Sequence, residues 1–374
     1  MNELMVLTHG DVLAELQGQV GLITLNRAKA LNALSLDMVR DITRVLRSWQ
    51  HNDQVKAIAM RGMGKDGVFG AFCAGGDIRF FHQAALADDP RLEDFFTEEY
   101  RLNHLIHHYP KPCMVFMDGV VMGGGMGLAQ GAKLRIATER TKMAMPETLI
   151  GLFPDVGGGY FLSRCQGALG EYLGLTGQML NGAEAVFAGL ADVLVDSASL
   201  NAMWTQLPAY HWSRPHALET FTRAFQTATQ QNTPAWWTDS LDQAFSANDL
   251  KSIAKALEET ANHHALEALH KRSPLMLAVT LEQIRRARQM NLSDELRMER
   301  DMVRHSFHLQ HLHRTPAQSD TVEGIRALAV DKDHAPRWSP SLIDEVTTDM
   351  VMPFFTSPWP AAAHPLQDLQ APVT

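Results

Sequence analysis

Short apolar runs, separated by glycine-rich turns and longer amphipathic segments, dominate the first half of this chain. Three such runs have the length and composition of strands: Val20–Leu25, which fits a strand buried on both faces, Val55–Gly62, and Cys113–Met117, which fits a buried strand. Segments with apolar residues at helical spacing lie between and after them. This alternation predicts an α/β fold built on a parallel or mixed sheet with helices covering it.

The helical segments of the first half can be placed from their spacing and their caps. Leu36–Leu46 carries apolar residues at helical intervals, and Ser35 directly before it is a suitable N-cap. Arg91–His108 predicts a second helix, which is polar but contains several aromatic residues. Residues 167–195 predict two further helices and a last strand.

The second half of the chain has a different composition. Tryptophans cluster between residues 204 and 237, and the polar stretch Thr229–Pro234 is typical of a linker. From Leu241 to Phe307 the pattern is helical throughout, with N-cap signals at two serines, Ser246 and Ser293. The proline-rich end, residues 357–374, predicts a loose or surface-draped tail. We therefore divide the chain into 1–198, a core; 199–340, a helical region; and 341–374, a tail.

Composition and charge restrict the class of protein. Of 374 residues 45% are hydrophobic and 20% are charged, which is ordinary for a soluble globular protein. A net charge of −9 argues against nucleic acid as a partner, although a local basic patch could still bind an acidic ligand. The three cysteines lack metal-ligand spacing and fit a reducing compartment. No apolar run approaches the ~20 residues of a membrane helix, and nothing suggests export, so we expect a cytoplasmic protein without a membrane partner.

Two glycine triplets, Gly123–Gly125 and Gly157–Gly159, stand out in the segment from Asp118 to Arg164. The first follows the predicted strand Cys113–Met117 and precedes a small, apolar segment that suits a tightly packed helix. A strand that turns through glycines into a helix leaves free N–H groups at the helix start, where partial positive charge accumulates. Such a turn can bind an anion or a developing oxyanion. The alternative is that the glycines only permit a tight turn or close packing.

Two carboxylates lie between and beside the triplets, and each directly follows a proline. They are Glu147 in Met-Pro-Glu and Asp155 in Phe-Pro-Asp. Proline restricts the backbone before each acid, and apolar residues surround both, which should raise their proton affinity toward neutral pH. Each acid taken alone could equally be a surface or helix-capping carboxylate. A further glycine element, Phe72–Ile78, follows the predicted strand Val55–Gly62.

Four segments together resemble the crotonase (enoyl-CoA hydratase/isomerase) superfamily, and within it the 3-hydroxyisobutyryl-CoA hydrolases. They read FCAGGDI (72–78), GVVMGGGMG (119–127), MPETLIG (145–151) and FPDVGGGYFLSR (153–164). The resemblance covers Gly21 to Trp338 and is weaker between residues 198 and 265. It implies an α/β fold of the ClpP/crotonase-like type, a spiral of ββα units, with a helical C-terminal region covering the site.

The resemblance also implies a set of site residues. The peptide N–H groups of Gly76 and Gly124 would form an oxyanion hole for a thioester carbonyl, and Glu147 and Asp155 would be the catalytic acids. The first coenzyme A-contacting loop of the family resembles NRAKALNAL (26–34), although Lys29 could equally be a solvated surface lysine. Substrate-binding positions carried over by motif are Lys29, Ala30, Ala74, Gly75, Asp77 and Glu99.

The acids decide among the reactions of this family, because the oxyanion hole serves all of them. Hydratases resemble one another in having a glutamate two residues after the glycine triplet, and here that position is Gly127. Hydration by paired glutamates is therefore in doubt, and Glu147 with Asp155 remains. Glu147 would attack the thioester carbonyl or act as a base on water. Asp155 would orient the 3-hydroxyl group or water and help to protonate the departing thiolate.

The resemblance thus implies hydrolysis of a short 3-hydroxyacyl-CoA thioester, 3-hydroxyisobutyryl-CoA above all, as in valine catabolism. Coenzyme A is then part of the substrate, and no separate cofactor is implied. The alternatives are hydration or isomerisation with Glu147 as the single base, and a non-catalytic acyl-CoA-binding homologue. Homo-oligomer formation stays open. Four histidines have spacing that could suit a metal, but no carboxylate or thiolate stands near them in sequence, so we expect no metal; they are His305, His308, His311 and His313.

Overall fold

The structure, a computed structural model, describes residues 3–227 and 233–370. It divides into two compact units, each assembled from three separate stretches of chain. The sheet unit comprises Met1–Gly76, Leu102–Ala144 and Met179–Pro234, and the helix unit comprises Asp77–Arg101, Met145–Gln178 and Ala235–Thr374. The units alternate along the sequence. The division into 1–198, 199–340 and 341–374 stays a prediction about stretches of sequence.

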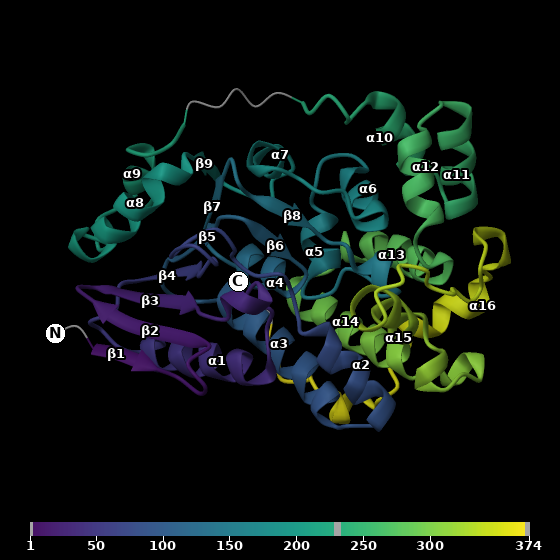
Figure 1. Cartoon of the computed structure of the whole chain (residues 1–374), viewed down its shortest axis with the longest axis horizontal. Coiled ribbons are helices and arrows are strands. Elements are labelled where there is room, and N and C mark those ends of the chain that lie inside the picture. Colours follow the sequence, from purple (N-terminus) through teal and green to yellow (C-terminus); the bar gives the residue numbers. More distant parts are fainter. Residues whose placement is uncertain (1–2, 228–232, 371–374) are drawn as a thin grey trace. The chain divides into compact units, whose positions relative to one another are not determined.

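The described strands form one large and one small sheet in the sheet unit (Figure 1). The large sheet has seven strands in the order β1-β2-β3-β4-β5-β7-β9, while β6 pairs with β8. Strand β2 pairs antiparallel with β1 and with β3, and every later pairing is parallel. The bounds are β1 (Glu3–Val6), β2 (Val12–Gln17), β3 (Val20–Leu25), β4 (Ala57–Gly62), β5 (Cys113–Met117), β6 (Val120–Met122), β7 (Leu134–Thr138), β8 (Lys142–Ala144) and β9 (Val193–Val195).

The strands predicted from apolar runs are confirmed. The strands β3 and β5 have the predicted bounds, and all their residues are buried; β4 begins two residues later than predicted, at Ala57. Parallel pairing of β3, β4 and β5 requires crossover connections, and the segments between these strands supply them. The predicted α/β class with a mixed sheet is confirmed.

Helices and aromatic residues cover the sheet within its own unit. Helix α1 begins where predicted, because the Ser35 side chain accepts a hydrogen bond from the N–H of Met38. Trp204 packs on Phe116 of β5 with ring centroids 5.4 Å apart, and both belong to the buried core with Trp212. The helices are α1 (Leu36–Gln50), α4 (Gly124–Gln130), α7 (Gly182–Phe187), α8 (Leu200–Gln206) and α9 (Ala217–Arg223).

The described part of the helix unit contains no strand. Helix α3 (Arg91–His107) ends one residue before its predicted end. Its residues up to Arg101 belong to this unit, and the remaining residues belong to the sheet unit. The remaining helices are α2 (Ile78–Ala87), α5 (Gly158–Leu162), α6 (Leu169–Thr176), α10 (Asp239–Phe245), α11 (Leu250–Glu259), α12 (His263–His270), α13 (Pro274–Ala287), α14 (Leu292–Phe307), α15 (Asp320–Ile325) and α16 (Thr348–Val351).

Two predicted helix caps in this unit are wrong. Ser246 ends α10 instead of starting a helix, and its hydroxyl donates to the carbonyl of Asp242, four residues earlier. Ser293 lies inside the first turn of α14, where Asn291 is the cap and accepts from the N–H of Asp294. A serine hydroxyl can satisfy either a free N–H or a preceding carbonyl, so the residue type alone does not fix the helix end.

The tryptophan-rich segment is divided between the two units. Trp204 and Trp212 lie in the sheet core, whereas Trp236 stacks on Tyr172 of the helix unit with ring centroids 5.4 Å apart. The predicted linker Thr229–Pro234 lies largely outside the described residues.

The C-terminal tail is draped on the helix unit rather than loose. Phe354 and Leu366 are fully buried, and the side chain of Asp368 makes an ion pair with Arg101 at 2.7 Å. Apolar residues between the prolines therefore anchor the described part of this segment.

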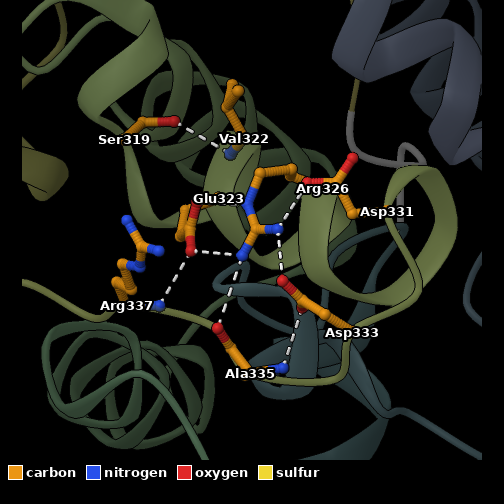
Figure 2. Close-up of polar contacts among 8 residues, drawn as sticks. All are labelled: Ser319, Val322, Glu323, Arg326, Asp331, Asp333, Ala335 and Arg337. Atoms are coloured by element: carbon orange, nitrogen blue, oxygen red, sulfur yellow. Dashed lines mark hydrogen bonds and ion pairs between the residues drawn. The ribbon is translucent and has the colours of Figure 1, made fainter.

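After α15, a network of hydrogen bonds and ion pairs centred on Arg326 fixes residues 331–337 (Figure 2). The Arg326 guanidinium donates to Glu323 at 2.8 Å, to Asp331 at 2.6 Å and to Asp333 at 2.7 Å. The N–H of Arg337 donates to Glu323 at 2.8 Å. One planar cation thus ties the following loop back to the helix, because its several donors point in fixed directions.

Candidate active site

In the sheet unit, the segment Ala71–Gly76 is bound on both sides by backbone hydrogen bonds. On one side the N–H of Leu34 donates to the carbonyl of Gly75 at 2.8 Å. On the other, the N–H of Met122 donates to the carbonyl of Cys73 at 3.0 Å. Leu34 also forms a parallel bridge with Gly76. The segment that carries the predicted N–H donor of Gly76 is thereby held like a short strand.

Asn32 is the side chain that organises this region, and the sequence analysis missed it. It is fully buried, and its amide group donates to the carbonyls of Met63, Ala71 and Phe72 at 2.9–3.0 Å. Its side-chain oxygen accepts the N–H of Arg27 at 2.9 Å. Its φ of 57° lies in the left-handed region that asparagine tolerates better than most residues. In the sequence, the asparagine directly after the NRAKAL stretch could have indicated this structural role.

The first glycine triplet forms the start of α4. Gly123 is the N-cap, with a φ of 47°, and Gly124 is the first helical residue, whose N–H has no acceptor within the helix. A Cβ on Gly125 would lie 2.3 Å from the carbonyl oxygen of Cys73, so only glycine permits this approach. A Cβ on Gly75 would lie 3.6 Å from the nitrogen of Gly124. The structure therefore brings Gly75 beside Gly124, and the oxyanion-hole function of Gly76 and Gly124 stays a prediction.

The predicted coenzyme-contacting residues lie next to the same segment. Lys29 is exposed and Ala30 is half-buried, and both belong to a single 3₁₀ turn, Ala28–Ala30. Ala74 donates its N–H to the carbonyl of Leu31 at 3.0 Å. Because this N–H is already bonded, the backbone contact to adenine that the resemblance implies for Ala74 would have to use its carbonyl oxygen. The binding roles of these three residues stay predictions.

In the helix unit, Glu147 begins the 3₁₀ turn Glu147–Ile150 and is buried, with 6% of its surface exposed. Helix α15 holds this turn in place: the Thr321 hydroxyl donates to the carbonyl of Gly151 at 2.6 Å, and Gly324 packs directly on the backbone of Ile150. Within the described residues, Oε2 of Glu147 has no hydrogen-bond partner. Burial and the nearby Asp155 raise the pKa of Glu147 well above its usual value.

Asp155 is equally buried and interacts with Tyr100 of α3. The phenol of Tyr100 donates to Oδ2 of Asp155 at 2.9 Å. Burial raises the pKa of Asp155 to about 7, the negative charge of Glu295 adds to this effect, and the hydrogen bond from Tyr100 opposes it. A carboxyl group with this pKa can give and take a proton near neutral pH.

Glu99, predicted as a substrate contact, is the third acid of this cluster. It is 2% exposed, and among the described residues its Oε1 has no hydrogen-bond partner. Burial raises its pKa, and Asp155 and Glu147 raise it further. The structure thus brings Glu99, Glu147 and Asp155 within electrostatic range of one another, so that a negative charge on Asp155 raises the pKa of both glutamates. Their catalytic and binding roles stay predictions.

Asp77 has a structural contact that its predicted role did not include. Its side chain caps α2 by accepting the N–H of Phe80 at 3.4 Å. A capped helix start is a common use of aspartate. A substrate contact by Asp77 stays a prediction.

Helix α14 supplies two further buried acids that the sequence analysis missed. Glu299 accepts the N–H groups of Gly157 at 2.8 Å and Gly159 at 3.2 Å, in the turn that follows Asp155. Glu295 lies one helical turn earlier, and burial raises its pKa to about 7. Both side chains are fully buried. Two acids four residues apart on the apolar face of a predicted helix were the sign that could have revealed them.

A buried ion network connects the helices that carry these acids. Arg300 of α14, 1% exposed, makes an ion pair with Glu93 of α3 and donates to the hydroxyl of Thr97 at 3.0 Å. Arg304 also pairs with Glu93, at 2.7 Å. Burial alone would raise the pKa of Glu93, but His308, Arg300 and Arg304 together hold it well below its usual range. The network fixes α14 against the part of α3 that carries Glu99 and Tyr100.

Three of the four C-terminal histidines have protein partners. His305 contacts the carbonyl of Thr356 at 2.9 Å, and His311 contacts that of Met350 at 3.2 Å. His308 lies 3.5 Å from Glu93. Over residues 3–227 and 233–370, no group of three or more His, Cys, Asp or Glu side chains is arranged to hold a metal ion. No helix in the same ranges is long and apolar enough to cross a bilayer.

Comparison with known proteins places the chain in a family. The family model described as enoyl-CoA hydratase/isomerase matches residues 20–355. A protein of Gallus gallus named 3-hydroxyisobutyryl-CoA hydrolase, mitochondrial, is 38% identical over 91% of this chain and 87% of its own length. A Homo sapiens protein of the same name is 37% identical over 93% of this chain and 89% of its own.

Solved structures agree with this placement. The chain resembles a structure described as carnitinyl-CoA dehydratase from Mycobacterium thermoresistibile, with a TM-score of 0.83 and 36% identity over 92% of this chain and 96% of the other. It also resembles an enoyl-CoA hydratase from Rhodobacter sphaeroides, with a TM-score of 0.82 and 35% identity over 93% and 97% of the two chains. The predicted crotonase fold is confirmed. The chain belongs to the enoyl-CoA hydratase/isomerase, or crotonase, family.

Proposed function

We propose that the chain hydrolyses a short 3-hydroxyacyl-CoA thioester, with 3-hydroxyisobutyryl-CoA as substrate and 3-hydroxyisobutyrate and coenzyme A as products. The observation that carries the proposal is the buried pair of acids Glu147 and Asp155, whose pKa values are both raised, together with glycine at position 127. The relatives named 3-hydroxyisobutyryl-CoA hydrolase support this substrate. With it, the enzyme would act in valine degradation. Location in the cytoplasm stays a prediction, and several of these relatives are named mitochondrial.

The chemistry of the acids can be written as a balanced sequence. In the covalent route the Glu147 carboxylate attacks the thioester carbonyl, the C–S bond breaks, and a mixed anhydride forms. Protonated Asp155 gives its proton to the departing thiolate. Water then opens the anhydride, and the Asp155 carboxylate takes up the proton that water loses. A pKa of about 7 suits Asp155 to both transfers.

Tyr100 and Glu99 complete the chemistry of the helix unit. The phenol of Tyr100 holds one oxygen of Asp155 and leaves the other for the substrate or the proton. Burial raises the pKa of Glu99, and in its protonated form Glu99 can donate a hydrogen bond to the acyl group's hydroxyl. In the sheet unit, the N–H groups of Gly76 and Gly124 would stabilise negative charge on the carbonyl oxygen.

Hydration of an enoyl-CoA is the second candidate, because the two similar solved structures are described as a dehydratase and a hydratase. In that reaction Glu147 would act alone as the base. Gly127 has no side chain that could share the proton transfers, so we favour hydrolysis.

A two-substrate assay tests the proposal. The enzyme is incubated with 3-hydroxyisobutyryl-CoA and, separately, with crotonyl-CoA, while free thiol and enoyl absorbance are followed independently. We expect thiol release with the first substrate and stable enoyl absorbance with the second. Loss of enoyl absorbance with crotonyl-CoA, without thiol release from either substrate, would show that the enzyme is a hydratase and not a hydrolase.

A single-turnover experiment in ¹⁸O water separates the covalent route from general-base catalysis. Attack of water at the glutamyl carbon of the anhydride leaves ¹⁸O in the peptide that contains Glu147, and the product stays unlabelled. We favour the covalent route, because a carboxylate fixed beside the carbonyl has a high effective concentration. Hydroxylamine would trap an anhydride as a hydroxamate on Glu147. Label only in the product, without hydroxamate, would establish Glu147 as a base.

A further inference from the structure

The carboxylate of Glu299 contacts the turn that carries Asp155, yet the proposed chemistry makes no use of it. Its Oε2 accepts the N–H of Gly157 at 2.8 Å, and its Oε1 accepts the N–H of Gly159 at 3.2 Å. Both donors follow Asp155 within four residues, whereas Glu299 comes from 142 residues further along the chain than Gly157. The contact is therefore a tertiary one, made by α14 to the turn before α5.

Gln283 of α13 holds the other side of the same turn. Its side-chain nitrogen donates to the carbonyl of Pro154 at 2.7 Å and to Oε1 of Glu299 at 2.9 Å. Pro154 directly precedes Asp155. Hydrogen bonds that meet at Glu299 thus fix the backbone immediately before the catalytic acid and shortly after it.

The backbone between these contacts is strained. Val156, next to Asp155, has a φ of 58°, which a β-branched residue rarely adopts. Such a conformation costs free energy and persists only where the surroundings impose it. The N–H of Gly158 donates to the carbonyl of Asp155 at 2.8 Å and closes the turn. Without an external acceptor for Gly157 and Gly159, the chain after Asp155 could relax.

We propose that Glu299 is a positioning residue for Asp155. Its carboxylate, together with Gln283, holds the strained turn Pro154–Gly159 so that the acid keeps its place beside Tyr100 and the substrate. This inference rests on the catalytic role of Asp155 in the proposed function. A glutamate suits the task because its two side-chain oxygens can accept the three N–H donors that converge on it.

A glutamine at position 299 would test the role, because it keeps the volume but turns one acceptor into a donor. We expect Glu299→Gln to lower kcat about 10- to 100-fold, as a small misplacement of a catalytic group does, with KM changed less than about threefold. The matched control is Glu171→Gln, the same substitution at a buried glutamate of α6 that makes an ion pair with Arg288. It leaves the hydrogen bonds to the turn in place, so its kcat should stay within about threefold of wild type.

Thermal midpoints of both variants separate positioning from stability. A merely structural role predicts comparable losses of active protein in both variants, with unchanged kcat per folded enzyme. Wild-type kcat in folded Glu299→Gln would overturn the inference. So would an equal loss of kcat in Glu171→Gln, because the effect would then follow from any change to a buried glutamate of this unit.

A double variant shows whether Glu299 acts through Asp155. If it does, Glu299→Gln should cost less than about threefold in kcat when Asp155 is already asparagine, since coupled residues are non-additive. Losses that multiply would overturn the inference. An unchanged kcat in Asp155→Asn alone would instead refute the role of Asp155 in the proposed function, so the two failures can be told apart.

Gln283→Met provides a second route if Glu299→Gln does not fold. It removes the donors to Pro154 and Glu299 while keeping a similar volume. We expect kcat to fall about 3- to 10-fold at unchanged KM, and this loss to vanish in the Asp155→Asn background. Full activity of folded Gln283→Met, in the absence of a folded Glu299→Gln, would overturn the inference.

Discussion

The two glycine triplets have the same sequence and similar local structure but different surroundings. Each begins a short helix, α4 at Gly124 and α5 at Gly158. In each, the preceding glycine is an N-cap with positive φ, 47° at Gly123 and 87° at Gly157, and no side chain of its own to cap the helix. Both turns therefore present backbone N–H groups at a helix start.

What meets those N–H groups differs. In the first triplet, glycine permits close contact with the backbone of Cys73, and the N–H of Gly124 has no acceptor within its helix. In the second, the carboxylate of Glu299 already accepts the N–H groups of Gly157 and Gly159. The same motif can thus provide a site for an external anion or bind an internal one. In the proposed function the first triplet serves the substrate and the second serves Asp155.

The largest effect should come from Glu147, one of the two acids between the triplets. Glu147→Gln keeps the side-chain volume but removes nucleophilicity and basicity, so we expect kcat to fall by about 10³ or more while acyl-CoA binding persists. Steady-state kinetics and titration calorimetry with the product coenzyme A measure the two quantities. A variant that keeps more than a tenth of wild-type kcat would show that Glu147 is not the central group.

Substituting proline for the first helical residue of α4 and of α5 allows a direct comparison of the two triplets, because this helix position tolerates proline. Gly124→Pro removes one N–H without removing an internal hydrogen bond of α4, and we expect kcat to fall about 10²–10³-fold with a small change in thermal midpoint. Gly158→Pro removes the bond to the carbonyl of Asp155 and should lower the midpoint clearly. Equal midpoints for the two variants, or full activity of Gly124→Pro, would contradict the distinction.

Asp155→Asn should reduce kcat about 10- to 100-fold through loss of proton transfer and substrate orientation. Because the pKa of Asp155 is about 7, wild-type kcat should change with pH around neutrality. That inflection should be missing in the variant. Identical kcat, KM and pH profiles for the two enzymes would exclude contact of Asp155 with the reacting atoms.

Gly127→Glu places an acid just after the first triplet, where hydratases resemble one another in carrying one. Residue 127 is buried in α4, so a glutamate would crowd the site, and we expect hydrolysis to fall about tenfold. We expect no efficient hydration of crotonyl-CoA, because Asp155 remains. A strong gain of hydration would show that this single position selects the reaction.

The smallest effect concerns stability and pH. Burial raises the pKa of Glu295 to about 7 from 4.5, so the folded state binds its proton more tightly than the unfolded state does. This contribution to stability is complete below pH 4.5 and is lost as pH rises through 7. Glu295→Gln removes this pH-dependent decrease in folding stability, because glutamine has no proton to lose in this range. Its thermal midpoint relative to wild type should therefore be a few degrees higher at pH 8 than at pH 5, and a constant difference would contradict the raised pKa.

Local patterns determined the secondary structure of the sheet unit and the motif residues. Buried strands are apolar along their whole length, so β3 and β5 could be read to the residue. Glycines and prolines restrict the backbone at their own positions, which is why the turns around Gly124 and Asp155 were visible in the sequence. The helix end at Ser246 was not, because a serine can bond to a preceding or a following peptide.

Tertiary structure alone decided which polar groups meet. Asn32 reaches carbonyls about 30 to 40 residues away, and Glu299 reaches the turn after Asp155 from more than a hundred residues away. No spacing rule connects such partners. The raised pKa of Asp155 likewise depends on burial and on Glu295, a residue of another helix. The sequence therefore indicated Glu147, Asp155 and the glycines. The fold determined the proton affinity of these acids and the residues that position them, because both properties depend on contacts between segments far apart in the chain.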